Sequence, residues 1–137
     1  MIVVDASAIV AILQREPGCD KLVAALKLGD KAVTSPIGMF EAALAVRRIL
    51  GCATTEAERL VADFLALSGI EVMGLPADLA HEALTAFDRF GKGTGHSARL
   101  NLGDCFIYAQ AARLGAALLY VGDDFPRTDV TPAASIP

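Results

Sequence analysis

The sequence predicts an α/β fold in which a central, mostly parallel sheet of four to five short strands is flanked by about six helices. Short apolar runs alternate along the chain with longer helix-compatible segments. Strands that are apolar throughout are typical of parallel sheets, because helices cover both of their faces. The chain has 137 residues and shows no internal repeat or linker-like stretch. We therefore expect a single domain over residues 1–137.

The first half of the chain is predicted to contain two strands and four helices. Strands are expected at residues 1–4 and 31–35, and helices at residues 7–14, 19–28, 36–50 and about 54–67. Ser35 and Pro36 are suited to the N-cap and the first position of the third helix, and Gly51 to its end. Thr54 or Thr55 is expected to cap the fourth helix.

The second half continues the alternation. Strands are expected at residues 70–75 and 117–121, with a last short strand in the tail, and helices at about 76–90 and 102–114. Asn101 is a suitable cap for the last helix and Gly115 a suitable terminator. A glycine-rich loop covers residues 91–97.

Composition narrows the classes of function. The net charge of −4 excludes a generic polyanion binder. The longest apolar stretch near the N-terminus, residues 6–13, is far shorter than the ~20 residues that span a bilayer, and no export signal precedes it. We therefore expect a cytoplasmic protein with no membrane partner. The three cysteines match neither a zinc pattern nor a disulfide framework.

Four acidic positions at wide spacing are the candidate site. Asp5 follows a buried strand, and Glu41 lies on or beside the apolar stripe of its helix. Asp104 lies in the first turn of a helix, and Asp123 ends another buried strand. Because sites in parallel sheets form at the carboxyl ends of the strands, these acids are expected to converge there. Asp124 is the alternative fourth acid.

Each acid also has a purely structural interpretation. Asp5 can cap the helix that follows it, and Glu41 can pair with Arg48 further along the same face. Asp104 is favourable to the helix dipole, and an Asp pair after a strand can simply form a turn. Taken singly, these positions leave both interpretations open.

Taken together, the acids predict a metal site. Several carboxylates at one sheet edge repel each other unless a cation lies between them, and oxygen-only ligands favour Mg²⁺ or Mn²⁺. No GxSxG motif, P-loop or strand-linked GxGxxG is present. The available chemistry is therefore hydrolysis by metal-activated water, with Asp5, Glu41, Asp104 and Asp123 as both metal ligands and catalytic residues.

The same residues resemble a known family. The segments 2–8, 35–42, 90–93, 100–108, 118–125 and 128–130 are similar in order and spacing to PIN-domain nucleases, most closely to VapC-type toxins of bacterial toxin–antitoxin pairs. The resemblance covers essentially the whole chain. It implies a PIN fold, a Mg²⁺- or Mn²⁺-dependent endoribonuclease, homodimerisation and a VapB-type antitoxin. It carries the family's acidic positions onto Asp5, Glu41, Asp104 and either Asp123 or Asp124.

Substrate contacts are predicted at three further residues. Ser7 can hydrogen-bond a metal ligand or a phosphate, or it can serve as a helix cap. Lys92 and Arg99 lie in the one clearly basic interval of the chain, between Asp88 and Asp104. We expect this interval to contact RNA phosphates, although a solvated loop explains it equally well.

Other functions remain open on the sequence alone. A metal-dependent DNA nuclease would use the same acids, and a non-catalytic RNA-binding PIN module would keep the same fold. A phosphatase or receiver-like domain with Asp5 as nucleophile is disfavoured, because Ser7 stands where a phosphatase of the haloacid-dehalogenase type needs a second Asp.

Overall fold

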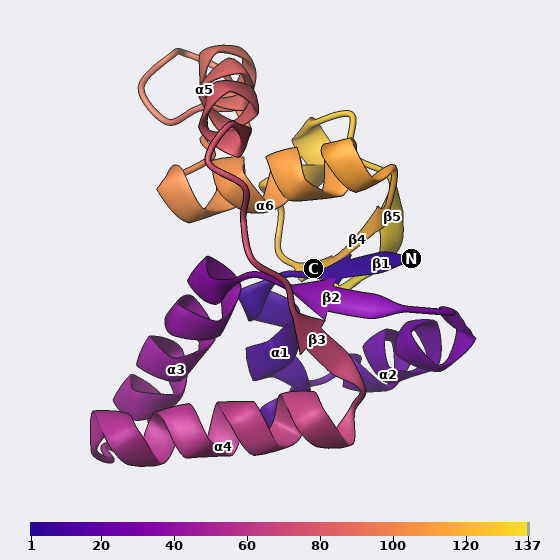
Figure 1. Cartoon of the computed structure of the whole chain (residues 1–137), viewed down its shortest axis with the longest axis vertical. Helices are drawn as coiled ribbons and strands as arrows, with labels where there is room; N and C mark the ends of the chain where they lie inside the picture. The colour runs from indigo at the N-terminus through magenta and orange to yellow at the C-terminus, as the bar shows by residue number, and fades with distance from the viewer. Residues whose placement is uncertain (137) are drawn as a thin grey trace.

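Strands and helices alternate through most of the structure, a computed structural model that describes residues 1–136 (Figure 1). In chain order the elements are β1 (Ile2–Val4), α1 (Ala6–Leu13), α2 (Cys19–Leu28), β2 (Ala32–Thr34), α3 (Pro36–Leu50), α4 (Thr54–Leu67), β3 (Ile70–Val72), α5 (Leu79–Phe90), α6 (Leu102–Leu114), β4 (Ala117–Val121), the short 3-10 helix η1 (Phe125–Arg127) and β5 (Pro132–Ile136). The predicted α/β class is confirmed, including the last strand in the tail.

The five strands form one parallel sheet in the order β3-β2-β1-β4-β5. From β1 the chain moves outward to β2 and β3 on one side, and then returns to place β4 and β5 on the other. The strand order therefore reverses between β1 and β4. In open α/β sheets such a reversal leaves a crevice at the carboxyl ends of the two strands.

Two apolar cores cover the two faces of the sheet. Ile2 and Val4 of β1 pack with α1–α4, whereas Val3 packs with α5, α6 and η1. Figure 1 shows α1–α4 on one side of the sheet and α5 and α6 on the other, with α5 resting on α6. This alternation explains why the two central strands, β1 and β4, are apolar along their whole length: helices cover both of their faces.

Most of the predicted helix boundaries agree with the structure. The Ser35 hydroxyl accepts a hydrogen bond from the Gly38 amide at 3.0 Å, and Asn101 forms a capping box with α6. Gly51 and Gly115 end their helices with φ angles of 62° and 58°, in the left-handed region where glycine is least strained.

One predicted helix cap and two predicted boundaries are wrong. Helix α4 begins at Thr54 and follows Ala53, and no side chain caps it; its exposed first amides can bond to water instead. Strand β3 ends at residue 72, not at 75, and α5 begins at Leu79, not at 76.

No helix in residues 1–136 combines the length and the apolar character needed to cross a bilayer.

Candidate functional site

A cavity of about 530 Å³ lies at the carboxyl edge of the sheet and collects most of the predicted acids. Its polar lining consists of Asp5, Ser7, Glu16, Glu41, Arg48 and Asp104. These residues come from the end of β1, from α1 and the loop after it, from α3 and from the first turn of α6. Acids that are up to 99 positions apart in the sequence (5 to 104) therefore line the same cavity.

Asp5 is the most buried of these acids, with 8% of its surface exposed. Its carboxylate accepts hydrogen bonds from the Ser7 amide at 3.0 Å and from the Ser7 hydroxyl, and so it caps α1. The Ser7 hydroxyl in turn accepts a hydrogen bond from the Val121 amide at 3.0 Å, which ties Asp5 to the end of β4. Asp5 thus both caps α1 and lines the cavity, because capping uses only part of the hydrogen-bonding capacity of a carboxylate. Burial raises the pKa of Asp5 despite these bonds.

Glu41 is half-buried and faces the cavity from α3. Burial raises the pKa of its carboxyl, and the negative charge of Asp5 raises it further. The ion pair with Arg48 that the sequence allowed does not form among the described residues. The carboxyl instead lies against Gly103 of α6, where a Cβ atom would collide with it.

Gly103 is a residue of the candidate site that could not be recognised from its local sequence. It lies next to Asp104, and the space left by its missing side chain is what allows Glu41 to approach the first turn of α6. The only signal in the sequence is a glycine inside a predicted helix, directly before a candidate acid. A glycine there costs the helix about 1 kcal/mol relative to alanine and therefore suggests a reason in packing.

Asp104 completes the cluster at the start of α6. Its carboxylate accepts a hydrogen bond from the Asn101 amide at 3.0 Å, while its own amide donates to the Asn101 side chain at 2.9 Å. Burial raises the pKa of Asp104 to about 7, against the Asn101 bond, and the charges of Asp5, Glu41 and Asp124 add to the rise. No cation of the described residues compensates these carboxylates through an ion pair.

The fourth acidic position stays open between Asp123 and Asp124. Asp123 and Asp124 are both exposed in the turn after β4, and neither lines the cavity directly. The charge of Asp124 contributes to the raised pKa of Asp104, whereas Asp123 is not among the contributors. Asp124 also lies directly before η1, whose Phe125 is buried in the core. Asp124 is thus the one of the two whose charge acts on the pKa of Asp104.

The donor set fits a hard divalent cation, although the ligands are not fully assembled. Among the described residues, no three His, Cys, Asp or Glu side chains are already close enough together to hold a metal ion. Mg²⁺ does not require such a trio, because it keeps several of its waters and binds through one or two carboxylates. Asp5, Glu41 and Asp104 supply oxygen atoms only, share one cavity and have raised pKa values, as expected where a cation would relieve their repulsion.

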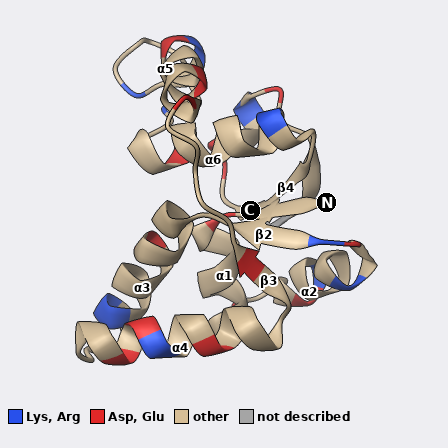
Figure 2. Cartoon of the chain, viewed as in Figure 1, with Lys and Arg blue, Asp and Glu red and all other residues tan. Residues whose placement is uncertain are grey.

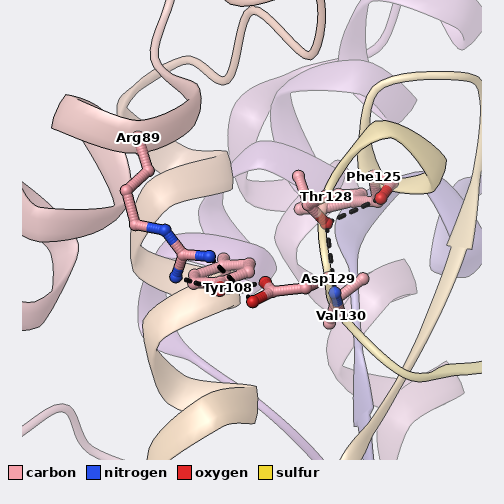
Figure 3. Close-up of polar contacts among 6 residues, drawn as sticks. All are labelled: Arg89, Tyr108, Phe125, Thr128, Asp129 and Val130. Carbon is pink, nitrogen blue, oxygen red and sulfur yellow. Dashed lines mark hydrogen bonds and ion pairs between the residues drawn. The ribbon is translucent and has the colours of Figure 1, made fainter.

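The basic interval before Asp104 is not a single surface. The Arg89 guanidinium on α5 donates hydrogen bonds to the Tyr108 hydroxyl at 3.2 Å and to the Asp129 carboxylate at 2.8 Å (Figure 3). Lys92 lines a separate, mainly apolar groove between α5 and α6, and Arg99 is exposed in the loop before α6. None of these lines the acidic cavity. Two charged lining residues, Glu16 and Arg48, were not assigned to a site from the sequence.

Comparisons with known proteins identify the family of the chain. A family model of the PIN domain matches residues 2–130. The chain therefore belongs to the PIN domain family. Within the family it is 44% identical to a VapC ribonuclease of Rhizobium meliloti over 139 aligned positions, which cover 93% of this chain and 97% of the relative. It is 41% identical to ribonuclease VapC42 of Mycobacterium tuberculosis over 133 positions, 97% and 99% of the two chains.

Solved structures show the same fold. The crystal structure of Mycobacterium tuberculosis VapC20, described as a toxin that cleaves the sarcin–ricin loop, superposes with a TM-score of 0.75 at 20% identity, over 96% of this chain and 97% of that one. The structure of VapBC-1 from nontypeable Haemophilus influenzae gives a TM-score of 0.67 at 19% identity, over 96% of both chains. The predicted PIN-like fold is thus confirmed.

Proposed function

We propose that this chain is a Mg²⁺- or Mn²⁺-dependent endoribonuclease that acts as the toxin of a toxin–antitoxin pair. The observation that carries the proposal is the single cavity in which Asp5, Glu41 and Asp104 face one another without a compensating ion pair. Relatives at 41% and 44% identity over nearly their whole length bear the name VapC ribonuclease, which supports RNA as the substrate.

In this proposal Asp5, Glu41 and Asp104 hold the cation, and Asp124 serves as the fourth acid. When bound, the cation would lower the pKa of a water molecule and offset the negative charge that develops on the phosphate. Ser7 orients Asp5, because its hydroxyl donates a hydrogen bond to the carboxylate and accepts one from the Val121 amide. Gly103 keeps Glu41 close to Asp104. One cavity carboxylate takes up the proton of the attacking water.

The partners follow from the same family assignment. We propose a VapB-type antitoxin and a homodimer, with RNA as the substrate and a cytoplasmic location. The solved neighbour from nontypeable Haemophilus influenzae is described as a structure of VapBC-1, which supports a VapB-type partner. Leu28 and Leu67, which end α2 and α4, are 89% and 90% exposed, and such large exposed apolar side chains are suited to a protein partner.

The proposal is tested by incubating the purified chain with total bacterial RNA in Mg²⁺, Mn²⁺ or EDTA, beside an Asp5→Asn variant. Asn keeps the capping acceptor for the Ser7 amide but removes the charge, so the variant is expected to fold. We expect cleavage by the unaltered chain with either metal, and none with EDTA or with Asp5→Asn. Cleavage that survives EDTA, or equal cleavage by both chains, would contradict the mechanism.

The same assay separates the alternatives. A single-stranded DNA of matched sequence, cleaved in place of the RNA, would identify a DNA nuclease. Binding of RNA without cleavage under every metal condition would identify a non-catalytic RNA-binding module.

A further inference from the structure

Arg48 shares the face of α3 that carries Glu41. The two residues are seven positions apart, which is close to two helical turns, and Leu44 and Ala45 between them line the same cavity. Seven residues of α-helix rise about 10 Å, so Arg48 lies beyond the carboxylates, along the wall of the cavity. The last turn of α3 is basic, as Figure 2 shows, and contains Arg47 and Arg48.

Unlike two other arginines, Arg48 is not held by a carboxylate. Arg89 bonds to Asp129, and Arg113 bonds to Asp78 and Glu82 at 2.8 and 2.7 Å. Among the ion pairs of the described residues, none involves Arg48, even though Glu16 and Glu41 line the same cavity. Its guanidinium is therefore available to a ligand.

The cavity needs such a group if its ligand is an RNA strand. Four carboxylates, those of Asp5, Glu16, Glu41 and Asp104, face the cavity, and each repels a phosphate. Arg48 is the one cationic side chain among the lining residues. A guanidinium can bind a phosphate with two parallel hydrogen bonds, which gives direction as well as attraction.

We propose that Arg48 is a positioning residue that binds an RNA phosphate neighbouring the scissile one and so sets the register of the strand across the acids. The proposal rests on the proposed function for the identity of the ligand. The expectation that Lys92 and Arg99 contact RNA phosphates is a separate prediction, because both residues lie outside the cavity. In this arrangement the scissile phosphate lies at the end of the cavity that carries the carboxylates, about 10 Å from Arg48 along α3.

The test uses the full chain with the Asp5→Asn change, so that RNA is bound but not cut, and a fluorescent single-stranded RNA of mixed sequence as the probe. Binding is measured by anisotropy at several salt concentrations for Arg48→Ala, Arg48→Lys and Arg47→Ala. Arg47 is the matched control, because it has the same charge, the same helical turn and an exposed side chain, but does not line the cavity. Thermal unfolding confirms that each variant is folded.

We expect Arg48→Ala to weaken binding about tenfold and to reduce the slope of log affinity against log salt by about 0.7, the value for one phosphate contact on a single strand. Arg48→Lys should keep the slope at an intermediate affinity, because lysine supplies the charge without the bidentate geometry. Arg47→Ala should change affinity less than about twofold. Equal effects at positions 47 and 48, an unchanged slope or no binding by the Asp5→Asn parent would overturn the proposal.

Cleavage separates this inference from the function on which it rests. A chain without the Asp5→Asn change that cleaves RNA, while its binding does not depend on Arg48, overturns the role of Arg48 alone. A chain that never cleaves, yet binds RNA through Arg48 as described, overturns the nuclease and supports the role of Arg48.

Discussion

The acidic cavity and the cluster around Asp129 contain the same kinds of side chain in opposite electrostatic states. At Asp129 the Tyr108 hydroxyl and the Arg89 guanidinium both donate to the carboxylate and hold its pKa below the usual range. In the cavity, burial and neighbouring negative charge raise the pKa of Asp104 to about 7. Asp129 has a counter-charge within the chain, the Arg89 guanidinium, whereas Asp104 forms no ion pair among the described residues.

The contrast separates the acids whose charge is neutralised by an arginine of the chain from those whose charge is not. Asp129 joins α5, α6 and the loop before β5, and Arg113 joins α6 to Asp78 and Glu82 near the start of α5. Those carboxylates are satisfied by the protein itself. The cavity acids carry a desolvation cost that the chain does not offset, which is a common property of sites that bind a cation from solution.

The largest expected effect is the loss of RNA cleavage when the charge of Asp104 is removed, and removal of the Asp129 charge is the matched control. Asp104→Asn keeps a side-chain acceptor for the Asn101 amide but removes a proposed metal ligand, so RNA cleavage should fall at least about 100-fold, as for the loss of one strong electrostatic group in an active site. Asp129→Asn should leave cleavage within about twofold. Initial rates with Mn²⁺ measure both. Equal losses at the two positions would remove the distinction between the regions.

A change at Gly103 tests the cavity without altering a charge. In Gly103→Val the new side chain would displace the Glu41 carboxyl, and cleavage should fall about 10- to 100-fold, because small displacements of a catalytic group are costly. Weaker Mn²⁺ binding, measured by calorimetry, should accompany the loss. Gly74→Ala is the control, since a Cβ there meets nothing within 4 Å. An active Gly103→Val variant with normal Mn²⁺ affinity would show that Glu41 does not need this position.

The stability of the metal-free chain should depend on pH through the cavity acids. The folded-state pKa of Asp104 lies above its unfolded value of 3.8, so the folded chain binds more protons between about pH 4 and 7 and loses stability as the pH rises through that interval. The raised pKa values of Asp5 and Glu41 act in the same direction. The expected loss is of order 2 kcal/mol once partial exposure is allowed for.

Denaturant unfolding at pH 5 and pH 8 measures this loss, and Asp104→Asn should reduce it. Mn²⁺ should restore stability more at pH 8 than at pH 5, because protons compete with the metal for the carboxylates. Stability that rises from pH 5 to pH 8 in the metal-free chain would contradict the raised pKa values.

The smallest expected effect lies in the Asp129 cluster. Asp129→Ala removes the acceptor of both Arg89 and Tyr108, and the free energy of unfolding should fall by about 1 kcal/mol, because the cluster is partly exposed. Asp63→Ala, an exposed acid of α4 outside the ion pairs of the described residues, should change stability less. Equal small losses would mean that Asp129 contributes no more than an ordinary surface acid.

The local features of the site were predictable from the sequence. Asp5 after an apolar strand, Ser35 before Pro36 and Asn101 three residues before Asp104 are short-range patterns, and the backbone within a few residues decides their role. The alternation of apolar runs likewise determined the α/β class, because only a doubly covered parallel sheet buries such strands on both faces. The choice between cap and ligand for Asp5 could not be made locally, since the residue serves as a cap and faces the cavity.

What the tertiary structure alone decided are relations between residues distant in the chain. Gly103 makes room for Glu41, Arg89 is taken by Asp129, and Glu16 and Arg48 join the cavity wall. No local pattern encodes these relations, because they depend on where the strand order reverses and on how α3 and α6 pack across that edge. The sequence by itself determined which acids are present and which elements carry them. Packing determined which acids keep an uncompensated charge, and that is the property on which the proposed chemistry depends.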